Sequence, residues 1–564
     1  MSRIHLSRIL MSRIPGRTKV SKAVGWALAH QIQSLSLALR LPLRLPLRLV
    51  LFAGVAVCAQ LAGPAWAGVI YVRGNATGAK TGLSWADAYT DLQAGLAAAE
   101  WGDEIWVARG TYKPTSGTDR SISFLLVAGV GLYGGFVGTE TALGQRDWET
   151  NATILSGDIG TSGSATDNSY HVVAGAHLAV LDGFTITGGN ANGSGSFNQG
   201  GGMFNDGGSP TVTNCTFSGN TTSGFGGGMY SGSGSSPSVA NCTFAGNTTS
   251  NGGGGMFNDG GSPALTNCTF SGNTASGTGG RGGGMYNLGC SPTVTNCTFR
   301  SNTASGTGGG WGGGVYNTSS SPTVTDCTFS GNTASSGGGG MYNSGGSPSV
   351  TNCTFSGNTA SGTGGYGGGG MYNTSSSPTV TNCMFSGNTA SGTGGYGGGV
   401  SGGKTFANCT FTGNTASVSG GGMVNWSGSQ TVTNCIFWDN SAPSGAETYK
   451  AGGTPTFSHC DIKGCGGSGA LWNPALGTDG GGNIMANPRF LAPATPAGPD
   501  ELWRTRDDGL RLQSDSPCIG AADPTLAPQK DILGLTRKIA PDIGAYEFYV
   551  MPPARADPAW RLFR

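Results

Sequence analysis

Polar and apolar residues alternate in short runs through the middle of the chain, and this pattern repeats. The stretch Gly200–Asn220 is GGGMFNDGGSPTVTNCTFSGN. Near-copies begin at Gly226, Gly253, Gly282, Gly312, Gly338, Gly368, Gly397 and Gly420. A β-branched run such as Pro210–Phe217, set between Gly, Ser, Asn and Pro turns, is typical of a short strand. Because one such unit cannot bury its own apolar face, the repeat predicts a stacked parallel β-solenoid.

Three positions recur in all nine copies and indicate what the solenoid buries. In the first copy they are Cys215, Phe217 and Asn220. Cys215 and Phe217 share one parity and Val212 has the other, so burying all three requires a bend between them. Asn214 stands at that point, and asparagine tolerates the left-handed backbone that such a bend needs. Stacked coils would place like residues roughly 4.8 Å apart, where asparagine and aromatic ladders stabilise stacking.

Variation in length is confined to one side of the repeat. The spacing from Met203 to Cys215 is 12 residues, and seven of the nine copies keep this value. From each cysteine to the Met or Val of the next Gly-Gly-Gly motif, the spacing varies between 14 and 18 residues. The extra residues have the type Ser-Gly-Thr-Gly-Gly. We therefore expect the insertions in one loop, along one edge of the solenoid.

On these motifs the chain resembles bacterial right-handed parallel β-helix proteins of the pectate-lyase-like superfamily. Its GGGMYN…NCTFSGN copies also resemble the repeats of polymorphic outer-membrane proteins. The resemblance implies an all-β fold, a single-stranded right-handed parallel β-helix with nine regular coils over residues 200–440. Function on such scaffolds lies in grafted sites, so the repeats alone say little about chemistry.

The first 67 residues predict a secretory signal peptide. They hold nine Lys/Arg and no Asp/Glu, and the apolar run Leu49–Gly63 is followed by an Ala-x-Ala pattern that ends at Ala67. A run of 15 apolar residues is too short to span a bilayer. We expect cleavage between Ala67 and Gly68, which leaves a mature chain without a transmembrane span and a protein that is secreted or held on the cell envelope.

Residues 68–199 are expected to form an amino-terminal cap and the first, irregular coils. A helix is predicted over Ser84–Glu100, because Ser84 and Asp87 form a capping box and apolar residues follow on one face. The stretch SWADAYTDLQAGLAAA resembles the corresponding region of secreted bacterial β-helix proteins. Such a helix would cover the open edge of the first coil.

Residues 441–550 hold a second family motif. The series NPxF…LRLxxxSPCIGAA…DILGxxR…DIGAYEF resembles the choice-of-anchor Q domain, which implies a segment closing the carboxyl end of the β-helix. Asp531 and Asp542 within it could be metal ligands, but Asp residues in tight turns more often accept bonds from backbone amides. The tail, residues 551–564, has no apolar span and no sortase motif.

Charge argues against two function classes. Removing residues 1–67 leaves 21 basic and 29 acidic residues, a net charge of −8, which disfavours nucleic-acid binding. Only seven charged residues fall between Asn190 and Asn440. Asp206 and Asp259 occupy equivalent turns two coils apart, roughly 10 Å by rung spacing, which suits an inverting hydrolase. Both stand in Asn-Asp-Gly-Gly turns that favour Asp for local reasons.

The same local interpretation applies to Asp103 and Glu104, which we expect in a turn before a strand. No catalytic residue is therefore assigned, and no metal or cofactor is expected. The nine coil cysteines lack the C-x2-C spacing of zinc sites, and neighbouring rungs are too far apart for disulfides. We expect buried free thiols, while Cys460 and Cys465 lie outside the register and are candidates for a disulfide.

One slot in the variable loop holds the candidate ligand-binding residues. Just before the Gly-Gly-Gly motif, successive copies place Phe225, Arg281, Trp311, Tyr366 and Tyr396. An exposed row of aromatic and Arg side chains would form a platform for stacking sugar rings. The alternative is that each ring folds back onto its own Gly-rich loop.

The leading hypothesis is a non-enzymatic adhesin or glycan-binding protein whose partner is a polysaccharide or a cell-surface glycan. The second is a polysaccharide lyase or glycoside hydrolase of the pectate-lyase-like group. The third is a structural spacer. The scarcity of charge in the coils favours the first and the third over the second.

Overall fold

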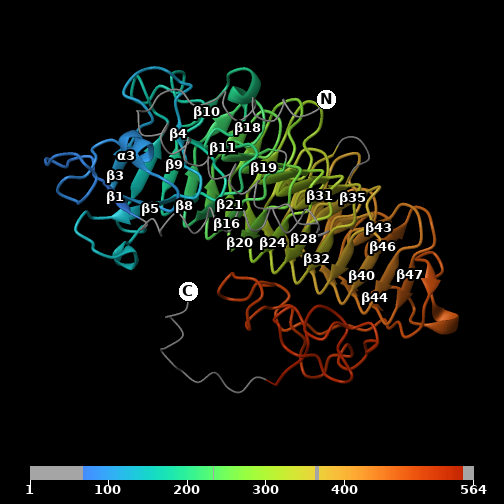
Figure 1. The fold of residues 1–564 in the computed structure, drawn as a ribbon. Helices are drawn as coiled ribbons and strands as arrows, with labels where there is room; N and C mark the ends of the chain where they lie inside the picture. The colour runs from blue at the N-terminus through green and yellow to red at the C-terminus, as the bar shows by residue number, and fades with distance from the viewer. Residues whose placement is uncertain (1–67, 233, 363–366, 551–564) are drawn as a thin grey trace, which may run out of the picture. The chain divides into compact units, whose positions relative to one another are not determined.

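The computed structural model describes residues 68–232, 234–362 and 367–550. The predicted signal peptide and the tail lie outside this range. The described strands form four parallel sheets, whose successive members stack side by side in Figure 1. Sheet A has 15 strands from β1 (Val69–Val72) to β49 (Thr478–Asp479), and sheet B has 13 from β3 (Gly110–Tyr112) to β48 (Asp461–Ile462). Sheet C has 12 from β4 (Phe124–Leu125) to β46 (Thr448–Lys450), and sheet D has nine from β10 (Asn190–Ala191) to β42 (Thr415–Ala416).

Each coil of the repeat passes once through the four sheets. The first regular coil contains β11 (Met203–Asn205) in sheet C, β12 (Thr211–Thr213) in sheet A, β13 (Thr216–Ser218) in sheet B and β14 (Thr221–Thr222) in sheet D. The next strand, β15 (Met229–Ser231), returns to sheet C and pairs in parallel with β11, with Met203 opposite Met229. The predicted β-solenoid and its register are confirmed.

The bend predicted between sheets A and B is present. Asn214 has φ +52°, and the asparagines at the same position of later coils have φ between +50° and +57°. The bend lets Val212, Cys215 and Phe217 all point inward, where each is at most 1% exposed. Asparagine is suited to this position because its short polar side chain stabilises the left-handed backbone.

The Gly-Gly-Gly motif marks the place where coils approach each other most closely. In one copy, Gly338 has φ +68°. A Cβ atom on Gly339 would lie 2.5 Å from Gly369 O and 2.6 Å from Thr359 O, so no side chain fits there. The glycines are therefore required by the contact between successive backbones.

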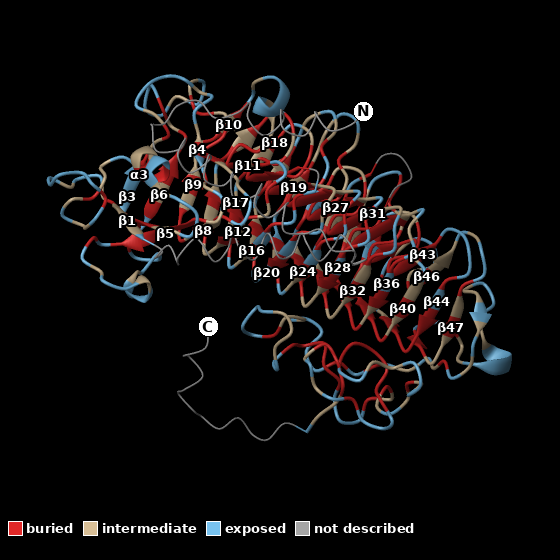
Figure 2. Cartoon of the chain, viewed as in Figure 1, coloured by how far each residue is buried: buried red, intermediate tan, exposed pale blue. Residues whose placement is uncertain are grey.

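The interior is built from stacked residues of the same type. Figure 2 colours much of the strands that carry them as buried. The phenylalanine rings from Phe217 to Phe437 stack at 4.5–4.9 Å between centroids, with interplanar angles of 2–8°. Burying each ring contributes about 1.5–3 kcal/mol to folding. The adjoining cysteines are all buried and free, as predicted. The suggested Cys460–Cys465 disulfide is wrong, because the Sγ–H of Cys465 donates to Ile484 O and both thiols are free.

A buried row of asparagines, which we call the inner Asn ladder, joins sheets B and D. Each member uses its full hydrogen-bonding capacity. Asn302 Nδ2 donates to Phe270 O (2.9 Å) and to Asn332 Oδ1 (2.9 Å), while Asn302 Oδ1 accepts from the backbone N (3.0 Å) and Nδ2 (2.9 Å) of Asn273. Such a fully satisfied polar network can be buried without the cost of unpaired groups. The ladder contains Asn220, Asn247, Asn273, Asn302, Asn332, Asn358, Asn388, Asn414 and Asn440.

The amino-terminal helix is shorter than predicted. Helix α3 covers Leu92–Ala98, and Asp91 caps it by accepting a bond from Gln93 N. Ser84 and Asp87 do bond to each other, but they close a turn whose Asp87 carboxylate also accepts from Ala79 N. The expected start at Ser84 is therefore wrong, because long-range bonds use the groups that a helix would need. None of the described helices is long and apolar enough to cross a lipid bilayer.

Residues 487–550, which we call the closing segment, contain no regular strand and pack against sheet B. Their apolar core includes Leu510, Cys518 and Ile543 and continues onto Met384 and Ile436 of the solenoid. The contacts run along the flank of the coils.

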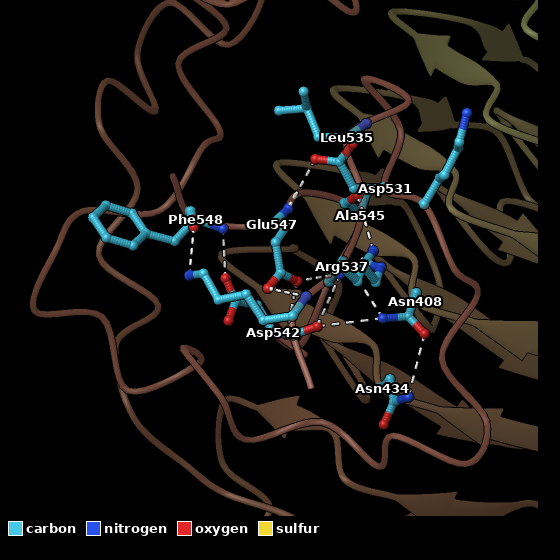
Figure 3. A network of polar contacts seen from close by, with 12 residues as sticks. Asn408, Asn434, Asp531, Leu535, Arg537, Asp542, Ala545, Glu547 and Phe548 are labelled. Atoms are coloured by element: carbon cyan, nitrogen blue, oxygen red, sulfur yellow. Dashed lines mark hydrogen bonds and ion pairs between the residues drawn. The ribbon is translucent and has the colours of Figure 1, made fainter. Parts of the chain in front are cut away.

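A buried ion pair fixes the closing segment. Arg537 Nη1 lies 3.2 Å from Glu547 Oε2, and both side chains are at most 2% exposed. Figure 3 shows Arg537 at the centre of a polar network that reaches Asn408 and Asn434 of the coils. Arg537 Nη2 also donates to Asn382 Oδ1 (3.0 Å) and to Gly544 O (2.9 Å). The bonds to neutral acceptors satisfy Nη1 and Nη2 of the buried guanidinium, while its Nε has no hydrogen-bond partner among the described residues.

Candidate functional site

The outer face of sheet C carries a second stack of rings, which we call the outer ring ladder. It begins at Phe204, and its neighbouring centroids are 4.9–5.5 Å apart. These rings belong to a cluster separate from the solenoid core. The ladder contains Phe204, Tyr230, Phe257, Tyr286, Tyr316, Tyr342 and Tyr372.

The candidate loop residues lie beside this ladder and in register with one another. Parallel bridges join Phe225 to Gly252, Gly252 to Arg281, and Arg281 to Trp311. Tyr396 is bridged in the same way to Ser419. We call this series the loop row. The structure therefore brings Arg281 and Trp311 together on adjacent coils, while Tyr396 lies further along the same row.

Each side chain of the loop row contacts a ring of the following coil. The Trp311 and Tyr342 centroids are 5.0 Å apart at 61°, and the Arg281 guanidinium lies 5.7 Å from the centroid of Tyr316. Tyr396 contacts Trp426 in the same edge-to-face manner at 4.9 Å. The alternative, in which each ring folds back only onto its own Gly-rich loop, does not describe these contacts, because the partner rings belong to the following coil. Tyr366 lies outside the described residues.

Exposure differs along the loop row. Arg281 is exposed, whereas Trp311 and Tyr396 are half-buried. The indole ring of Trp311 also packs against Gly337 of the next coil, where a Cβ atom on the glycine would lie 3.4 Å from the ring. The row thus presents fixed ring edges and one cation to solvent, rather than a set of free ring faces.

The two candidate coil carboxylates belong to the first and third regular coils. Burial, with smaller contributions from Asp259 and Asp206, raises the pKa of Tyr230 on the coil between them to about 12. Asp103 and Glu104 serve local structure, as expected. Asp103 Oδ1 accepts from Gly68 N, and Glu104 Oε2 accepts from Trp106 Nε1.

The acidic residues of the closing segment also have structural partners. Asp531 Oδ1 accepts from the backbone N of Leu533 (2.9 Å) and of Leu535 (2.8 Å), and Asp542 Oδ1 accepts from Gly520 N (2.8 Å). The backbone-amide interpretation of these two residues is confirmed. No group of three or more His, Cys, Asp or Glu suited to a metal ion occurs in the described part of the chain.

The asparagine stacking predicted for the coils also occurs along the corner between sheets A and B, whereas the contacts of this row with the closing segment were not predicted. The row consists of the left-handed residues of the bend, and we call it the corner ladder. Their side chains bond from rung to rung, as in Asn241 Nδ2 to Asn214 Oδ1 (3.3 Å) and Asn267 Nδ2 to Asn241 Oδ1 (3.1 Å). The corner ladder contains Asn214, Asn241, Asn267, Asn296, Asp326, Asn352, Asn382, Asn408 and Asn434.

Two grooves open onto the corner ladder. One, of about 320 Å³, is lined by Asn214, Asn241 and the side chain of Trp148. The other, of about 630 Å³, lies where the closing segment meets the ladder. It is lined by Asn296, Asp326, Asn352, Trp503, Arg504, Lys530, Ile532, Leu533 and Gly534.

The larger groove contains an ion pair between the ladder and the closing segment. Arg504 Nη1 lies 3.7 Å from Asp326 Oδ1. Asp326 is the one position of the corner ladder where the chain has Asp instead of Asn. This exception is the feature of the sequence from which the ion pair with Arg504 could have been suspected. Arg504 Nε is buried and has no hydrogen-bond partner among the described residues.

Comparison with known proteins supports the fold. A family model described as "Right handed beta helix region" matches residues 172–355, 300–437 and 340–476, which together span more than half of the chain. The search of the curated proteins found no match.

Several solved structures are similar at low identity. Pectate lyase Pel9A is 14% identical, with 85% of this chain and 96% of that chain covered and a TM-score of 0.38. Tailspike protein 3 of bacteriophage CBA120 is 13% identical, with 70% and 57% covered and a TM-score of 0.35. A rhamnogalacturonan lyase is 12% identical, with 79% and 97% covered and a TM-score of 0.27. On the family match and the stacked parallel sheets, the chain belongs to the right-handed β-helix family.

Proposed function

We propose that this protein is an extracellular, non-catalytic β-helix protein that binds a polysaccharide along the loop row. The observation that carries the proposal is the register of Arg281 and Trp311 on adjacent coils, each side chain fixed against a ring of the next coil. Tyr396 extends the same row. A polymer lying parallel to the solenoid would meet these side chains in sequence.

Fixed side chains favour binding because little conformational entropy remains to be lost when a ligand arrives. The edge-to-face contact of Trp311 with Tyr342 holds the indole in one orientation. Trp, Tyr and Arg are also the residue types most often found at binding hot spots. The exposed Arg281 adds hydrogen-bond donors that suit sugar hydroxyls or carboxylates.

Binding is favoured over cleavage by the placement of the coil carboxylates. A glycosidase needs two carboxyl groups on either side of the scissile bond. Asp206 and Asp259 both stand in Asn-Asp-Gly-Gly turns, where Asp is favoured for local reasons, and the stretch between Asn190 and Asn440 holds only seven charged residues. We infer that these two residues do not form a hydrolase pair.

Secretion and attachment belong to the same proposal. The apolar run and the Ala-x-Ala pattern support export with cleavage between Ala67 and Gly68, and Ala67 lies outside the described residues. The motif series in the closing segment supports its assignment to the choice-of-anchor Q group. An extracellular location would also suit the low charge of the coils, which hold seven charged residues between Asn190 and Asn440.

Affinity electrophoresis through gels cast with different polysaccharides tests the proposal. We expect retardation in at least one gel, with the polymer intact afterwards. The double variant Arg281→Ala/Trp311→Ala should lose the retardation. Trp101→Ala is the matched control, because Trp101 is 64% exposed and lies outside the loop row. Free migration of the wild-type protein in every gel would refute the proposal, and degradation of the polymer would show an enzyme instead.

A further inference from the structure

The corner ladder is divided into a covered part and an open part. Asn382, Asn408 and Asn434 are at most 2% exposed beneath the closing segment. Asn241 and Asn267 of the open part are exposed. We propose that the open part, from Asn214 to Asn352, is a second binding site that takes a neutral, extended oligosaccharide.

The covered part shows how the ladder amides bind. Asn382 Nδ2 donates to Asn352 Oδ1 (3.2 Å) within the ladder and to Lys530 O (2.6 Å) outside it. Asn434 Nδ2 donates to Asn408 Oδ1 (3.2 Å) and to Asp523 O (3.1 Å), while Asn434 Oδ1 accepts from Asp523 N (2.8 Å). Asn382 and Asn434 therefore each use one donor for the ladder and one donor and an acceptor for a second layer, while Asn408 Nδ2 donates to Asp542 O and Gly544 O of that layer.

The open rungs make the same ladder bonds but have no second layer. Asn267 Nδ2 donates to Asn241 Oδ1 (3.1 Å), and Asn296 Nδ2 donates to Asn267 Oδ1 (2.9 Å). Asn241 and Asn267 therefore each keep one donor and one acceptor for a ligand, on rungs roughly 4.8 Å apart. Paired donors and acceptors at a regular spacing fit a ligand that offers hydroxyls at a regular spacing.

The exception at Asp326 adds an acceptor site. An ionised carboxylate cannot donate, so Asn296 Oδ1 receives no bond from the next rung. Asp326 itself accepts from Asn352 Nδ2 (3.1 Å) and pairs with Arg504. Two acceptors, Asn296 Oδ1 and the Asp326 carboxylate, thus lie beside a guanidinium whose Nε has no partner among the described residues. A sugar hydroxyl can donate to one of these acceptors and accept from the guanidinium through the same oxygen atom.

Each end of the open part has a groove with a tryptophan. Trp148 and Asn214 line the smaller groove, and Trp503 and Asn352 line the larger one. Trp148 is 37% exposed and Trp503 is half-buried. Concave sites with an apolar ring and a few convergent polar groups are the usual form of small-ligand sites.

The charges in the two grooves balance. Glu149 lines the smaller groove, and Asp326, Arg504 and Lys530 line the larger one, so the charges cancel over the two grooves together and a charged polymer that spans both gains no net attraction. A neutral oligosaccharide is therefore favoured over an acidic one. This inference rests on the proposed function only in taking a polysaccharide as the ligand. The two sites are distinct, because the corner ladder joins sheets A and B whereas the loop row adjoins sheet C.

Calorimetric titration of the full chain tests the proposal. The probes are cellohexaose, maltohexaose and laminarihexaose as neutral ligands, hexagalacturonate as the acidic one, and a peptide of residues 520–534 as an extended polypeptide. We expect one neutral hexasaccharide to bind best. The double variant Asn267→Gly/Asn296→Gly, in which glycine keeps the left-handed backbone of the bend, should bind it about tenfold more weakly, since the hydrogen bonds of two ladder amides to the ligand are removed. Trp503→Ala, with folding checked by circular dichroism, should weaken binding without touching the ladder.

The outcomes separate this site from the loop row. Weaker binding in the ladder variants, with Arg281→Ala/Trp311→Ala unchanged, supports the corner site and refutes the loop row for that ligand. The reverse pattern overturns the corner site and leaves the proposed function standing. Tighter binding of hexagalacturonate or of the peptide overturns the ligand class. No binding of any probe by the wild-type protein overturns the proposed site outright, and retention in the polysaccharide gels then decides the proposed function separately.

Discussion

The inner Asn ladder ends at a carboxylate, and this makes the stability of the last coils dependent on pH. Asn440 Nδ2 donates to Glu447 Oε2 (2.5 Å), so Glu447 occupies the place of the next asparagine. Glu447 is 6% exposed. Burial raises the pKa of Glu447 from 4.5 to about 7, against the lowering effect of its bonds to Asn440 and of Lys463.

The direction of the effect follows from this shift. Because the folded-state pKa of Glu447 lies above the unfolded value, its contribution to stability is fully present below pH 4.5 and is lost as the pH rises through 7. Near pH 8 the buried carboxylate would cost up to about 3 kcal/mol relative to acidic conditions. Gln at this position can accept the same bonds from Asn440 and cannot ionise. We therefore expect Glu447→Gln to stabilise the protein at pH 8 and to have little effect at pH 4.

Thermal unfolding followed by circular dichroism between pH 4 and pH 8 measures this difference. If the whole chain unfolds cooperatively, the variant should melt on the order of 3 °C higher than wild type at pH 8, with the gap closing toward pH 4. Glu100→Gln serves as the control, because Glu100 is exposed. A Glu447→Gln gap that stays constant across the pH range would refute the argument, as would a variant less stable than wild type at pH 8.

Three further predictions concern the ladders, the ion pair and the thiols. Asn302→Ala should destabilise the protein by about 2–5 kcal/mol, because it leaves buried backbone groups unpaired, whereas Asn267→Gly, which keeps the left-handed backbone of the exposed corner, should cost less than about 1 kcal/mol in the same urea titration. Arg537→Met should leave Glu547 buried and unpaired, a cost of about 3–5 kcal/mol that limited proteolysis would register as faster cleavage within residues 487–550; equal cleavage of variant and wild type would contradict this role. In the native full chain, a thiol-reactive dye should label no cysteine other than Cys58, since the 13 described cysteines are buried, and labelling before unfolding would contradict the packed thiol row.

The repetitive part of the fold could be predicted from the sequence because its determinants are local. The parity of Val212 and Cys215 requires a bend, and Asn214 is a residue that can make one. Stacking of like residues follows directly from a constant period. The start of the helix was predicted wrongly because it depends on contacts outside the local motif. Asp87 N donates to Ser84 Oγ as in a capping box, but the Asp87 carboxylate accepts from Ser84 Oγ and from Ala79 N, and only the folded structure reveals this competing contact.

The candidate sites were less predictable because they depend on long-range contacts. Arg537 and Asn382 are 155 residues apart in the chain and bond directly, and no periodic signal links them. The position of Trp311 in the loop row could be inferred from the repeat, but its contact with Tyr342 depends on how a Gly-rich loop folds over the next coil. The corner ladder was visible in the sequence as a bend, whereas the second role that we propose for it becomes apparent only once the closing segment is seen to cover three of its nine rungs.

The matched register of the coils has a consequence for how such a chain can change in length. Val315 pairs with Met285 before it and with Met341 after it, so loss of one whole coil would bring Met285 opposite Met341 with every ladder still aligned. Unequal recombination between the near-identical repeats would therefore yield foldable proteins in steps of one coil. Each step would lengthen or shorten the open corner ladder by one rung. If the ladder binds a glycan as we propose, the length of glycan that such proteins bind would therefore differ in steps of one rung.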